Sequence, residues 1–414
     1  MSAWTVIIIA DLLLWAIIAV NVMYVLFFAL ASLLPQRQTA SRPYPQGPAA
    51  GRQPQGASAA PSFLVLFPAY REDAVIQHSV ETFLLQDYPQ KLYQVIVISD
   101  QMEAETNDLL RRLPVTVLLP AFEQSSKARA LQYAIDKVES GERKVERSDY
   151  VVILDADNIV ASNFLSQLAQ TVRPDEAIQC HRTAKNADND IAALDGISEE
   201  INNSIFRRGH NRIGLSSALI GSGMCFSYEW FRQNVVLLDS AVEDRELEVL
   251  LLKQGIFVRY AEDIIVKDEK VSNSDNFQRQ RLRWMTGQVQ AFFRMLPYLP
   301  KAIVTANINY IDKTIQQALI PRSILLVLTP LFTILSFFTL HSSIFNFQSS
   351  IIKWLVLLIA LVLSIVVAIP NHLRTTALFR KVLALPRLVG RMLNNILHIR
   401  TQNKEFIHTT HHHN

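Results

Sequence analysis

The sequence predicts an α/β domain with a mostly parallel sheet, held to a membrane by helices near both ends of the chain. Half of the 414 residues are hydrophobic, and the longest apolar runs lie near the two termini. Between these runs, residues 62–300 alternate short apolar segments with amphipathic ones, which is typical of strands and helices that follow one another around a parallel sheet. The mean hydropathy of +0.17 agrees with a mixed soluble and membrane architecture.

Charge and cysteine content exclude some functions. The formal net charge is only +3, so the composition gives no reason to expect a nucleic-acid partner. The two cysteines, Cys180 and Cys225, lie far apart in the sequence and lack the spacing of a metal site. We therefore expect a reduced domain that faces the cytosol.

Residues 1–34 contain the first predicted element, a transmembrane helix. From Val6 to Leu34 the sequence is almost wholly apolar, which is long enough to cross the roughly 30 Å hydrocarbon layer. No positive segment precedes this run and no small-residue cleavage site stands out, so we interpret it as an anchor rather than a signal peptide. Asp11 lies near one end and could reach the lipid headgroups; a functional buried charge is the alternative.

The C-terminal part predicts two more transmembrane helices within 323–370, at Ser323–Leu340 and Ile351–Ile369. An interfacial segment, 301–322, precedes them. Residues 371–414 begin with Leu, Val and Ile interleaved with Arg and Lys, which predicts a basic amphipathic tail lying on the lipid surface.

Arginine placement predicts the orientation. Arginines follow the first and last spans, whereas the loop 341–350 contains neither Lys nor Arg. The positive-inside rule therefore places the N-terminus outside and the central domain in the cytoplasm, as expected for an integral protein of the inner or plasma membrane. Residues 35–61 are rich in Pro, Gln, Gly, Ala and Ser, and predict a flexible linker.

The central domain contains five short apolar runs that predict strands. Amphipathic patterns at 74–86 and 126–138 predict helices between them. In open α/β sheets, ligands bind beyond the carboxyl ends of the strands, so polar residues at those ends are candidates for a functional site. The predicted strands are residues 63–68, 94–99, 115–119, 150–155 and 177–180.

Two carboxylates, Asp155 and Asp157, end the apolar run "YVVILDAD". Like charges at the end of a buried strand are tolerated when a divalent cation neutralises them, and hard oxygen ligands select Mg²⁺ or Mn²⁺. The alternative is that Asp157 caps the next helix and Asp155 is a turn residue. Polar residues also follow the first strand, at Tyr70 and Glu72, and the second, at Asp100.

Two later segments carry further candidates. Glu243 and Asp244 begin a helical pattern, where acidic residues can also serve only as partners of the helix dipole. In "FQRQRLRW", helical spacing places Gln280, Arg283 and Trp284 on one face. The alternative is an interfacial helix whose Arg and Trp lie at headgroup depth.

The ordered set of motifs resembles the membrane-bound enzymes of glycosyltransferase family 2, such as cellulose, hyaluronan and chitin-oligosaccharide synthases and ceramide glucosyltransferase. The motifs are "PAYRE", Asp100, "SKARALQYA", "DAD", "GSGMCF", "ED" and "QRLRW", spread over about residues 62–290. The resemblance implies a GT-A fold, which is a Rossmann-like α/β domain. It also implies an inverting hexosyl or N-acetylhexosaminyl transfer from a nucleotide sugar, with UDP as the implied nucleotide, to a membrane-associated or exported glycan.

The resemblance also implies roles for the donor-side residues. Tyr70 and Glu72 would line the pocket around the base and ribose. Asp100 would accept a hydrogen bond from the base, Lys127 would contact the bound nucleotide sugar, and Asp155 would hold the nucleotide side.

For the reaction itself, the resemblance implies that Asp157 holds the Mg²⁺ or Mn²⁺ bridging the diphosphate and that Asp244 is the general base. Gln280 and Arg283 would close over the diphosphate, and Trp284 would stack on the acceptor sugar. The acceptor site would be lined by Gly221, Ser222 and Gly223.

The chain departs from the family pattern in two ways. "GSGMCF" differs from the Cys-Gly-Ser signature of cellulose synthases, and only two predicted spans follow the catalytic domain. A transferase that adds a single sugar to a lipid is therefore the main alternative. A metal-dependent phosphohydrolase and a non-enzymatic membrane scaffold are more remote ones.

Overall fold

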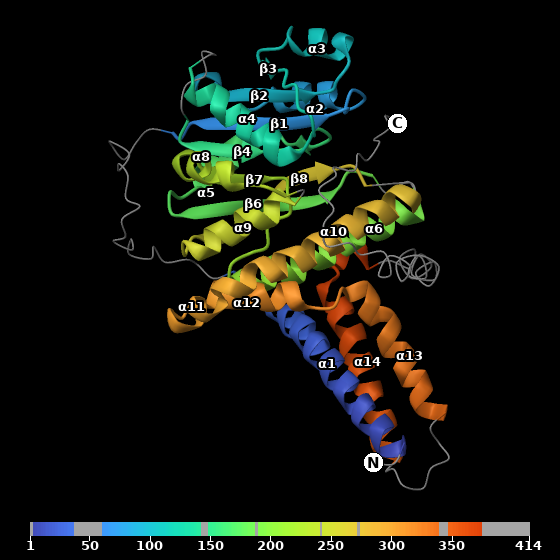
Figure 1. The fold of residues 1–414 in the computed structure, drawn as a ribbon. Helices are drawn as coiled ribbons and strands as arrows, with labels where there is room; N and C mark the ends of the chain where they lie inside the picture. Colours follow the sequence, from blue (N-terminus) through green and yellow to red (C-terminus); the bar gives the residue numbers. More distant parts are fainter. Residues whose placement is uncertain are drawn as a thin grey trace.

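The computed structural model describes residues 3–36, 60–141, 148–186, 189–240, 242–270, 274–338 and 347–374. Most of the expected linker and nearly all of the expected basic tail lie outside these residues. Figure 1 shows an α/β domain built on one sheet, with three long helices extending from its lower side. The N-terminus lies at the far end of those helices.

The strands of the domain are β1 (Phe63–Tyr70), β2 (Tyr93–Asp100), β3 (Thr116–Leu118), β4 (Tyr150–Ile153), β5 (Ile159–Val160), β6 (Glu176–Ala184), β7 (Met224–Ser227) and β8 (Phe257–Asp268). Its α-helices are α2 (Ile76–Phe83), α3 (Ala104–Leu110), α4 (Lys127–Glu139), α5 (Phe164–Thr171), α6 (Asp190–Asn202), α7 (His210–Arg212), α8 (Tyr228–Asn234), α9 (Glu243–Lys253) and α10 (Ser274–Met295). Shorter helical segments are η1 (Gln90–Leu92), the π-helical η2 (Asn203–Gly209), η3 (Val235–Leu237) and η4 (Leu296–Tyr298).

The strands form a single sheet in the order β3-β2-β1-β4-β7-β6-β8-β5. The pairs β1–β2, β1–β4, β2–β3 and β6–β8 are parallel, and the pairs made by β7 and β5 are antiparallel. The expected mostly parallel α/β sheet is therefore confirmed. The five predicted strands correspond to β1, β2, β3, β4 and β6, although β4 ends at Ile153, two residues before the predicted end.

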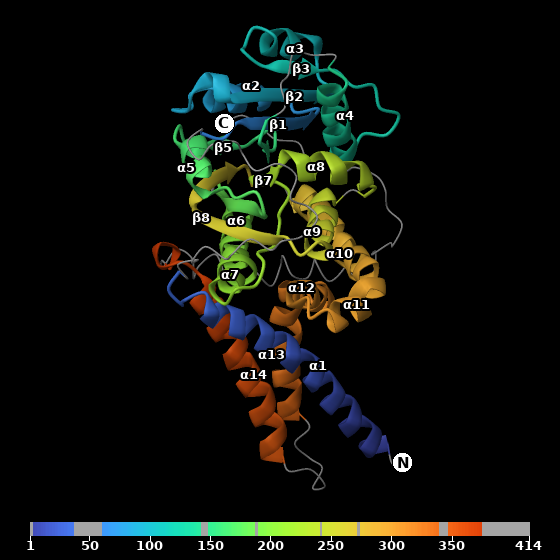
Figure 2. The same cartoon turned by 90° about the vertical axis from the view of Figure 1, so that its left-hand side faces the viewer.

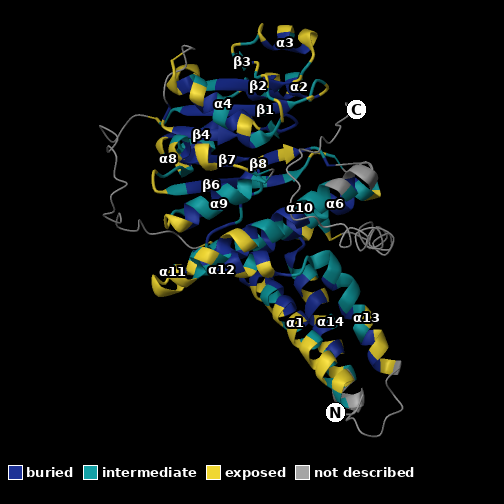
Figure 3. Ribbon diagram, in the orientation of Figure 1, coloured by how far each residue is buried: buried dark blue, intermediate teal, exposed yellow. Residues whose placement is uncertain are grey.

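Helices cover both faces of the sheet. The apolar side chains of β1 therefore point alternately into two hydrophobic cores, one on each face. Phe63 and Phe67 pack with α2 and α5 on one face, whereas Leu64 and Leu66 pack with α4, α8 and α9 on the other. A strand buried on both faces is a continuous apolar run, and this explains the sequence of β1. Figure 3 shows the central strands as buried and the outer faces of the long helices as largely exposed.

The long helices below the domain are α1 (Ala3–Ala31), α13 (Arg322–Phe338) and α14 (Phe347–Ala368), joined to the domain through α11 (Leu299–Val304) and α12 (Ile308–Ala318), and η5 (Asn371–Leu373) follows α14. By length and composition, α1 and α14 could each cross a membrane. Helices α12 and α13 meet the same criterion only as one span bent by 57°. Figure 2 shows α1, α13 and α14 leaving the same side of the domain.

The interior of this three-helix bundle is filled by apolar side chains, including Ile18, Leu325, Trp354 and Leu361. Asp11 of α1 forms an ion pair with Lys353 of α14 and accepts a hydrogen bond of 3.0 Å from Trp354 Nε1. The Asp11 carboxylate is therefore paired between two helices of the bundle.

The bundle joins the domain where α1 meets η2. The rings of Phe28 and His210 are stacked, with centroids 3.6 Å apart. A Cβ added to Gly209 would lie 2.2 Å from the carbonyl oxygen of Phe28, so only glycine permits this approach. The Tyr24 hydroxyl donates to Asp312 Oδ1 of α12 at 2.9 Å and lies 3.0 Å from His210 Nε2. Helix α1 is thus fixed to η2 and to α12.

Candidate active site

The carboxyl ends of β1 and β2 form the first part of the candidate site. Tyr70 and Asp100 are register partners on these neighbouring parallel strands. The next residues, Arg71 and Gln101, have φ angles of 54° and 55°, which non-glycine residues rarely adopt. Arg71 Nη2 donates to Gln101 Oε1 at 2.6 Å. Strained backbone of this kind gathers at ligand sites, and it supports the position expected from the strand ends.

Asp100 is the buried acid of this edge, with 3% of its surface exposed. Burial raises its pKa, while a hydrogen bond from Ser125 and the charge of Arg71 lower it. In the described part of the chain, Asp100 Oδ1 has no hydrogen-bond partner. An acceptor of this kind fits an N–H of a ligand, because a buried oxygen without a donor is costly.

Lys127, the first residue of α4, connects the "DAD" segment to the glycine-rich loop and to the start of α9. Ser126 caps the helix by accepting a hydrogen bond from Arg129 N, which fixes the start of α4. Lys127 Nζ contacts Asp155, donates to Gly221 O at 2.6 Å, and lies 3.4 Å from Glu243 Oε1. Burial lowers the pKa of Lys127, but Asp155 and Glu243 raise it further, so the side chain is an ammonium ion.

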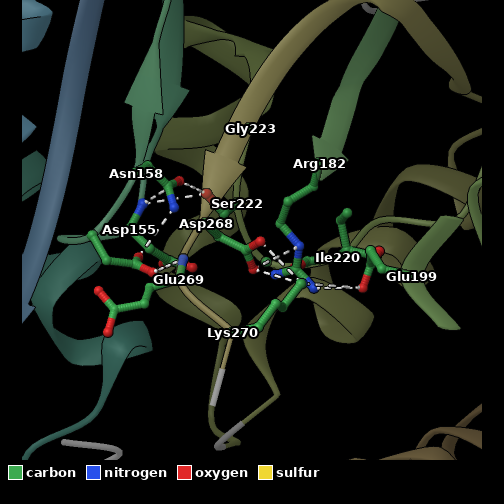
Figure 4. Close-up of polar contacts among 12 residues, drawn as sticks. Asp155, Asn158, Arg182, Glu199, Ile220, Ser222, Gly223, Asp268, Glu269 and Lys270 are labelled. Carbon is green, nitrogen blue, oxygen red and sulfur yellow. Dashed lines mark hydrogen bonds and ion pairs between the residues drawn. The ribbon is translucent and has the colours of Figure 1, made fainter. Parts of the chain in front are cut away.

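The "DAD" segment forms a turn held by the residue that follows it. Asn158 Oδ1 accepts a hydrogen bond of 3.0 Å from Asp155 N and also contacts Ser222 Oγ. Asn158 Nδ2 donates to Asp157 Oδ1 at 3.1 Å, and Glu269 N donates to Asp157 Oδ2 at 2.8 Å. Figure 4 shows this turn beside the end of β8. The alternative that Asp157 caps the next helix is wrong, because α5 begins only at residue 164.

Acidic side chains outnumber cations at this corner. The pKa of Glu72 rises to about 9, first because it is buried and then because Asp157, Asp155 and Glu269 lie nearby. Like charges that raise one another's pKa favour a bound cation. Among the described residues, no set of three or more His, Cys, Asp or Glu side chains is arranged to hold a metal ion.

The residues nevertheless fit a dication that is shared with a ligand. The two oxygens of Asp157 each accept one protein hydrogen bond and keep a further lone pair. Mg²⁺ usually binds through one or two carboxylates together with phosphate oxygens of the substrate. The donor set therefore suits Mg²⁺ or Mn²⁺ bound jointly with a diphosphate.

The paired acids at the start of α9 face the glycine-rich loop before β7. Gly221 has a φ of 84°, and a Cβ there would lie 3.8 Å from Glu243 Oε1 and 3.9 Å from Asp244 Oδ2. Burial raises the pKa of Glu243, opposed by its ion pair with Lys127. Asp244 is less buried, and its Oδ1 accepts a hydrogen bond of 2.8 Å from Arg245 N. Glu243 is thus engaged with Lys127, whereas Asp244 Oδ2 lies near Gly221.

The other residues of the glycine loop are packed rather than open. Ser222 is fully buried, and its hydroxyl contacts Asn158, so it supports the turn. Gly223 has a φ of 64°, and a Cβ there would lie 2.9 Å from Val266. Of the three residues expected to line an acceptor site, Gly221 lies nearest the acids.

Helix α10 contains the three residues expected on one helical face. In the part of the chain that is described, Gln280 Oε1 is buried without a hydrogen-bond partner. The guanidinium of Arg281 lies 4.7 Å from the ring centroid of Trp284 and forms an ion pair with Asp195 of α6. One face of Trp284 is therefore covered by Arg281, and Arg283 follows on the same helix.

A close contact places α10 beside the first turn of α9. A Cβ added to Gly287 would lie 2.6 Å from Val242 Cγ1, directly before Glu243. Gln280, Arg283 and Trp284 precede Gly287 by one to two turns. Their expected contacts with donor and acceptor remain predictions.

A buried ionic network behind the "DAD" turn was not predicted from the sequence. Arg182 Nη2 donates to Glu199 Oε2 at 3.1 Å, and its Nη1 donates to Ile220 O at 3.1 Å. Lys270 Nζ donates to Asp268 Oδ2 at 3.0 Å, and Arg182 Nε lies 3.5 Å from the same oxygen. Figure 4 shows these side chains converging between β6 and the end of β8. The network holds the backbone directly before Gly221.

The acids and Lys127 gather at the carboxyl edge of the sheet, where open α/β enzymes bind their ligands. Residues 60–287 match the family model described as "Glycosyltransferase like family 2". The chain therefore belongs to glycosyltransferase family 2, and the GT-A fold and the activity class expected from the motifs are confirmed.

Three known proteins illustrate what this chain is similar to. An N-acetylglucosaminyltransferase of Rhizobium meliloti (strain 1021) is 25% identical over 303 residues, which cover 67% of each chain. A mannosyltransferase of Pyrobaculum calidifontis, solved with GDP-Man and Mn²⁺, is 16% identical with a TM-score of 0.47, covering 82% of this chain and 87% of that one. TarS of S. aureus is 12% identical with a TM-score of 0.43, covering 81% and 88%.

Proposed function

We propose that this protein is an inverting, metal-dependent glycosyltransferase. It transfers a sugar from a nucleotide sugar, with UDP as the nucleotide, to a membrane-associated or exported glycan. The observation that supports this most directly is the position of Lys127. Its ammonium contacts Asp155 on the donor side, Glu243 on the acceptor side and Gly221 O between them. A residue proposed to bind the sugar donor and a residue proposed to bind the acceptor therefore both lie within the reach of Lys127.

Each part of the site has a role in this reaction. Asp100 accepts a hydrogen bond from the base, and Tyr70 and Glu72 flank the nucleotide. Asp157 would hold the dication, which would offset the negative charge that develops on the leaving diphosphate. Lys127 adds a fixed positive charge beside the same group.

Inverting transfer needs one base on the acceptor and no covalent intermediate. Asp244 takes the proton from the attacking hydroxyl, because its Oδ2 faces the Gly221 loop while Glu243 is paired with Lys127. Gln280 and Arg283 close over the diphosphate, and Trp284 stacks on the acceptor sugar. The face of Trp284 now covered by Arg281 would open when the acceptor binds.

The orientation follows from the charges that flank the spans. We place the catalytic domain in the cytoplasm, where nucleotide sugars are made, with the N-terminus of α1 outside. Amphipathic α12 buries Tyr310, Lys313 and Gln317 against the domain, and the exposed apolar residues Ile308 and Ile315 would lie at the lipid surface.

A single observation favours a second candidate function. The centre of the three-helix bundle is filled by Ile18, Leu325, Trp354 and Leu361, so one chain has no path for a polymer through the described helices. Addition of a single sugar to a lipid is compatible with such a bundle. Mass spectrometry of the product separates the two functions, because a polymerase yields a ladder of lengths and the alternative yields one glycolipid.

The decisive test uses purified protein in lipid and a panel of nucleotide sugars, with release of nucleoside diphosphate as the readout. We expect release to depend on an acceptor and on Mg²⁺ or Mn²⁺. Asp244→Asn should bind the donor but lose at least about 100-fold in turnover, as general base catalysis typically contributes. Asp263→Asn, which changes an exposed acid of β8, is the matched control. Acceptor-independent release of phosphate would instead identify a phosphohydrolase.

A further inference from the structure

Helix α12 carries two buried charges that point to opposite sides of the molecule. Asp312 accepts the hydrogen bond from Tyr24 of the membrane helix α1 and lies 3.2 Å from His210 Nε2. The next residue, Lys313, reaches the catalytic domain, where its Nζ lies 3.0 Å from Glu248 Oε1 of α9. One turn of α12 is therefore attached both to the membrane bundle and to α9, the helix whose first turn contains Asp244.

Glu248 also holds the loop that faces the catalytic acid. Its Oε1 accepts a hydrogen bond of 3.0 Å from Leu219 N, two residues before Gly221. Asp244 and Glu248 are four residues apart on α9 and therefore lie on the same face of the helix. A single carboxylate oxygen thus joins α12, α9 and the loop at Gly221.

Two further hydrogen bonds attach α12 to its neighbours on either side of this ion pair. Arg245, directly after Asp244, donates to Gln317 Oε1 of α12 at 2.6 Å. Ser216 N, at the start of the loop, donates to Asn309 Oδ1 of α12 at 2.8 Å. Helix α12 therefore contacts the loop at Asn309 and α9 at Gln317, and the ion pair between these two levels joins all three elements.

The central pair is buried to a degree that argues against a simple stabilising role. Lys313 is 1% exposed and Glu248 is 3% exposed. Desolvation of two charges offsets most of their attraction, so a well-packed apolar pair would usually be as stable. Lys313 Nζ makes no well-aligned hydrogen bond to any described residue, so its attraction to Glu248 is mainly electrostatic. The pair therefore contributes more to the positions of α9, α12 and the loop than to the stability of the domain.

We propose that Glu248 and Lys313 are positioning residues for the transfer reaction. They set the distance between the Asp244 carboxylate and the loop at Gly221, and through Asp312 they tie that distance to the membrane helix α1. The inference rests on the proposed role of Asp244 as the general base. Both side chains are buried, so we expect donor binding at Asp100 and Asp155 not to depend on the pair.

The test replaces both charges together, so that no buried charge is left alone. Glu248→Gln keeps an acceptor for Leu219 N, and Lys313→Met keeps the length of the side chain. We expect this double variant to bind UDP with Mn²⁺ as tightly as the wild type within twofold, by titration calorimetry. Its kcat should fall about 10- to 100-fold, because small misplacements of catalytic groups have effects of this size.

A second variant and a control address folding. Glu248→Asp keeps the charge but withdraws the carboxylate by one methylene, and it should also lower kcat at unchanged UDP affinity. The control is Glu176→Gln with Arg259→Met, which removes an ion pair of 2.6 Å between β6 and β8, at the far end of these strands from the site. The control should keep the wild-type kcat.

Each outcome decides the matter. A double variant or Glu248→Asp with wild-type kcat overturns the proposal, as does an equal loss of kcat in the control pair. Loss of UDP affinity in step with kcat would mean that the pair only stabilises the domain, and would also overturn it. Asp244→Asn is measured in parallel. If that variant is active, the general base is wrong; if it is inactive while the double variant is normal, only the positioning role is wrong.

Discussion

Replacing Lys127 with methionine should destabilise the domain more at pH 8 than at pH 5. Methionine keeps the length of the side chain and removes the ammonium that faces Asp155 and Glu243. Removing one partner of a buried ion pair costs about 3–5 kcal/mol, and solvent screens the more exposed Asp155. We therefore expect a loss of about 3 kcal/mol at pH 8. For a domain of this size that lowers the Tm by about 6–12 °C.

The pH dependence follows from Glu243. Its pKa is already raised in the folded protein by burial, and without Lys127 it should rise further. A carboxyl group with a raised folded pKa contributes stability below its unfolded pKa of about 4.3, and that stability is lost as the pH rises through the folded pKa. The stability of Lys127→Met should thus be closest to that of the wild type at pH 5. In the wild-type protein the raised pKa of Lys127 keeps the ammonium charged from pH 5 to 8.

Thermal unfolding in lipid nanodiscs, followed by tryptophan fluorescence at pH 5, 6.5 and 8, measures the effect. Lys137→Met, at the other end of α4, is the control and should lower the Tm equally little at each pH. If Lys127→Met lowers the Tm by the same amount at pH 5 and at pH 8, the assignment of the effect to Glu243 is refuted. If the Tm is unchanged at every pH, the buried ion pairs of Lys127 with Asp155 and Glu243 are refuted.

Three more predictions concern other parts of the molecule. Asp157→Ala should weaken UDP binding at least tenfold with Mn²⁺ and little without it; equal affinities in calorimetry would contradict the metal assignment. Gly209→Ala should lower stability by about 1–3 kcal/mol, because its Cβ would lie 2.2 Å from the Phe28 carbonyl oxygen. Unchanged thermal unfolding would show that α1 does not dock as described. Asp11→Leu should destabilise the bundle by about 3 kcal/mol because it leaves Lys353 unpaired, and adding Lys353→Leu should restore it. No rescue in nanodiscs would contradict the pairing.

The parts of the fold that could be predicted from the sequence are those with a strong local pattern. Strands β1, β2 and β4 are buried on both faces, so each is a continuous apolar run. Strand β8 was missed because exposed Asp263 and Lys267 interrupt its apolar residues near the edge of the sheet. Strand β7 was missed because three of its four residues, Met224 to Phe226, lie inside "GSGMCF", which was interpreted as a loop motif.

The residues of the candidate site likewise divide into those that a local sequence pattern predicts and those that it does not. Asp100 and Asp155 could be placed together because parallel strands deliver their carboxyl ends to one edge. The supporting contacts could not be predicted, because Glu269 meets Asp157 across 112 residues without any local pattern. Asn158 had a weak signal, since an Asn directly after two turn acids often bonds to nearby backbone.

The segment 301–322 shows a different limit of prediction from sequence. Its amphipathic pattern indicated a helix at the lipid surface, but the polar face of α12 is where Asp312 and Lys313 are buried against protein. A polar residue on an amphipathic helix can face water or a buried charged partner, and the pattern is the same for both. Only the tertiary contacts separate the two cases.

If the product is the exported glycan that we propose, the filled centre of the three-helix bundle has a consequence for its export. A sugar chain is too wide to pass between Trp354 and Leu361 while those side chains hold the helices together. Synthesis and export would then be separate tasks, and secretion would need other proteins or several copies arranged around a shared opening. Vesicles that contain this chain alone should accumulate glycan on the side where the nucleotide sugar is supplied.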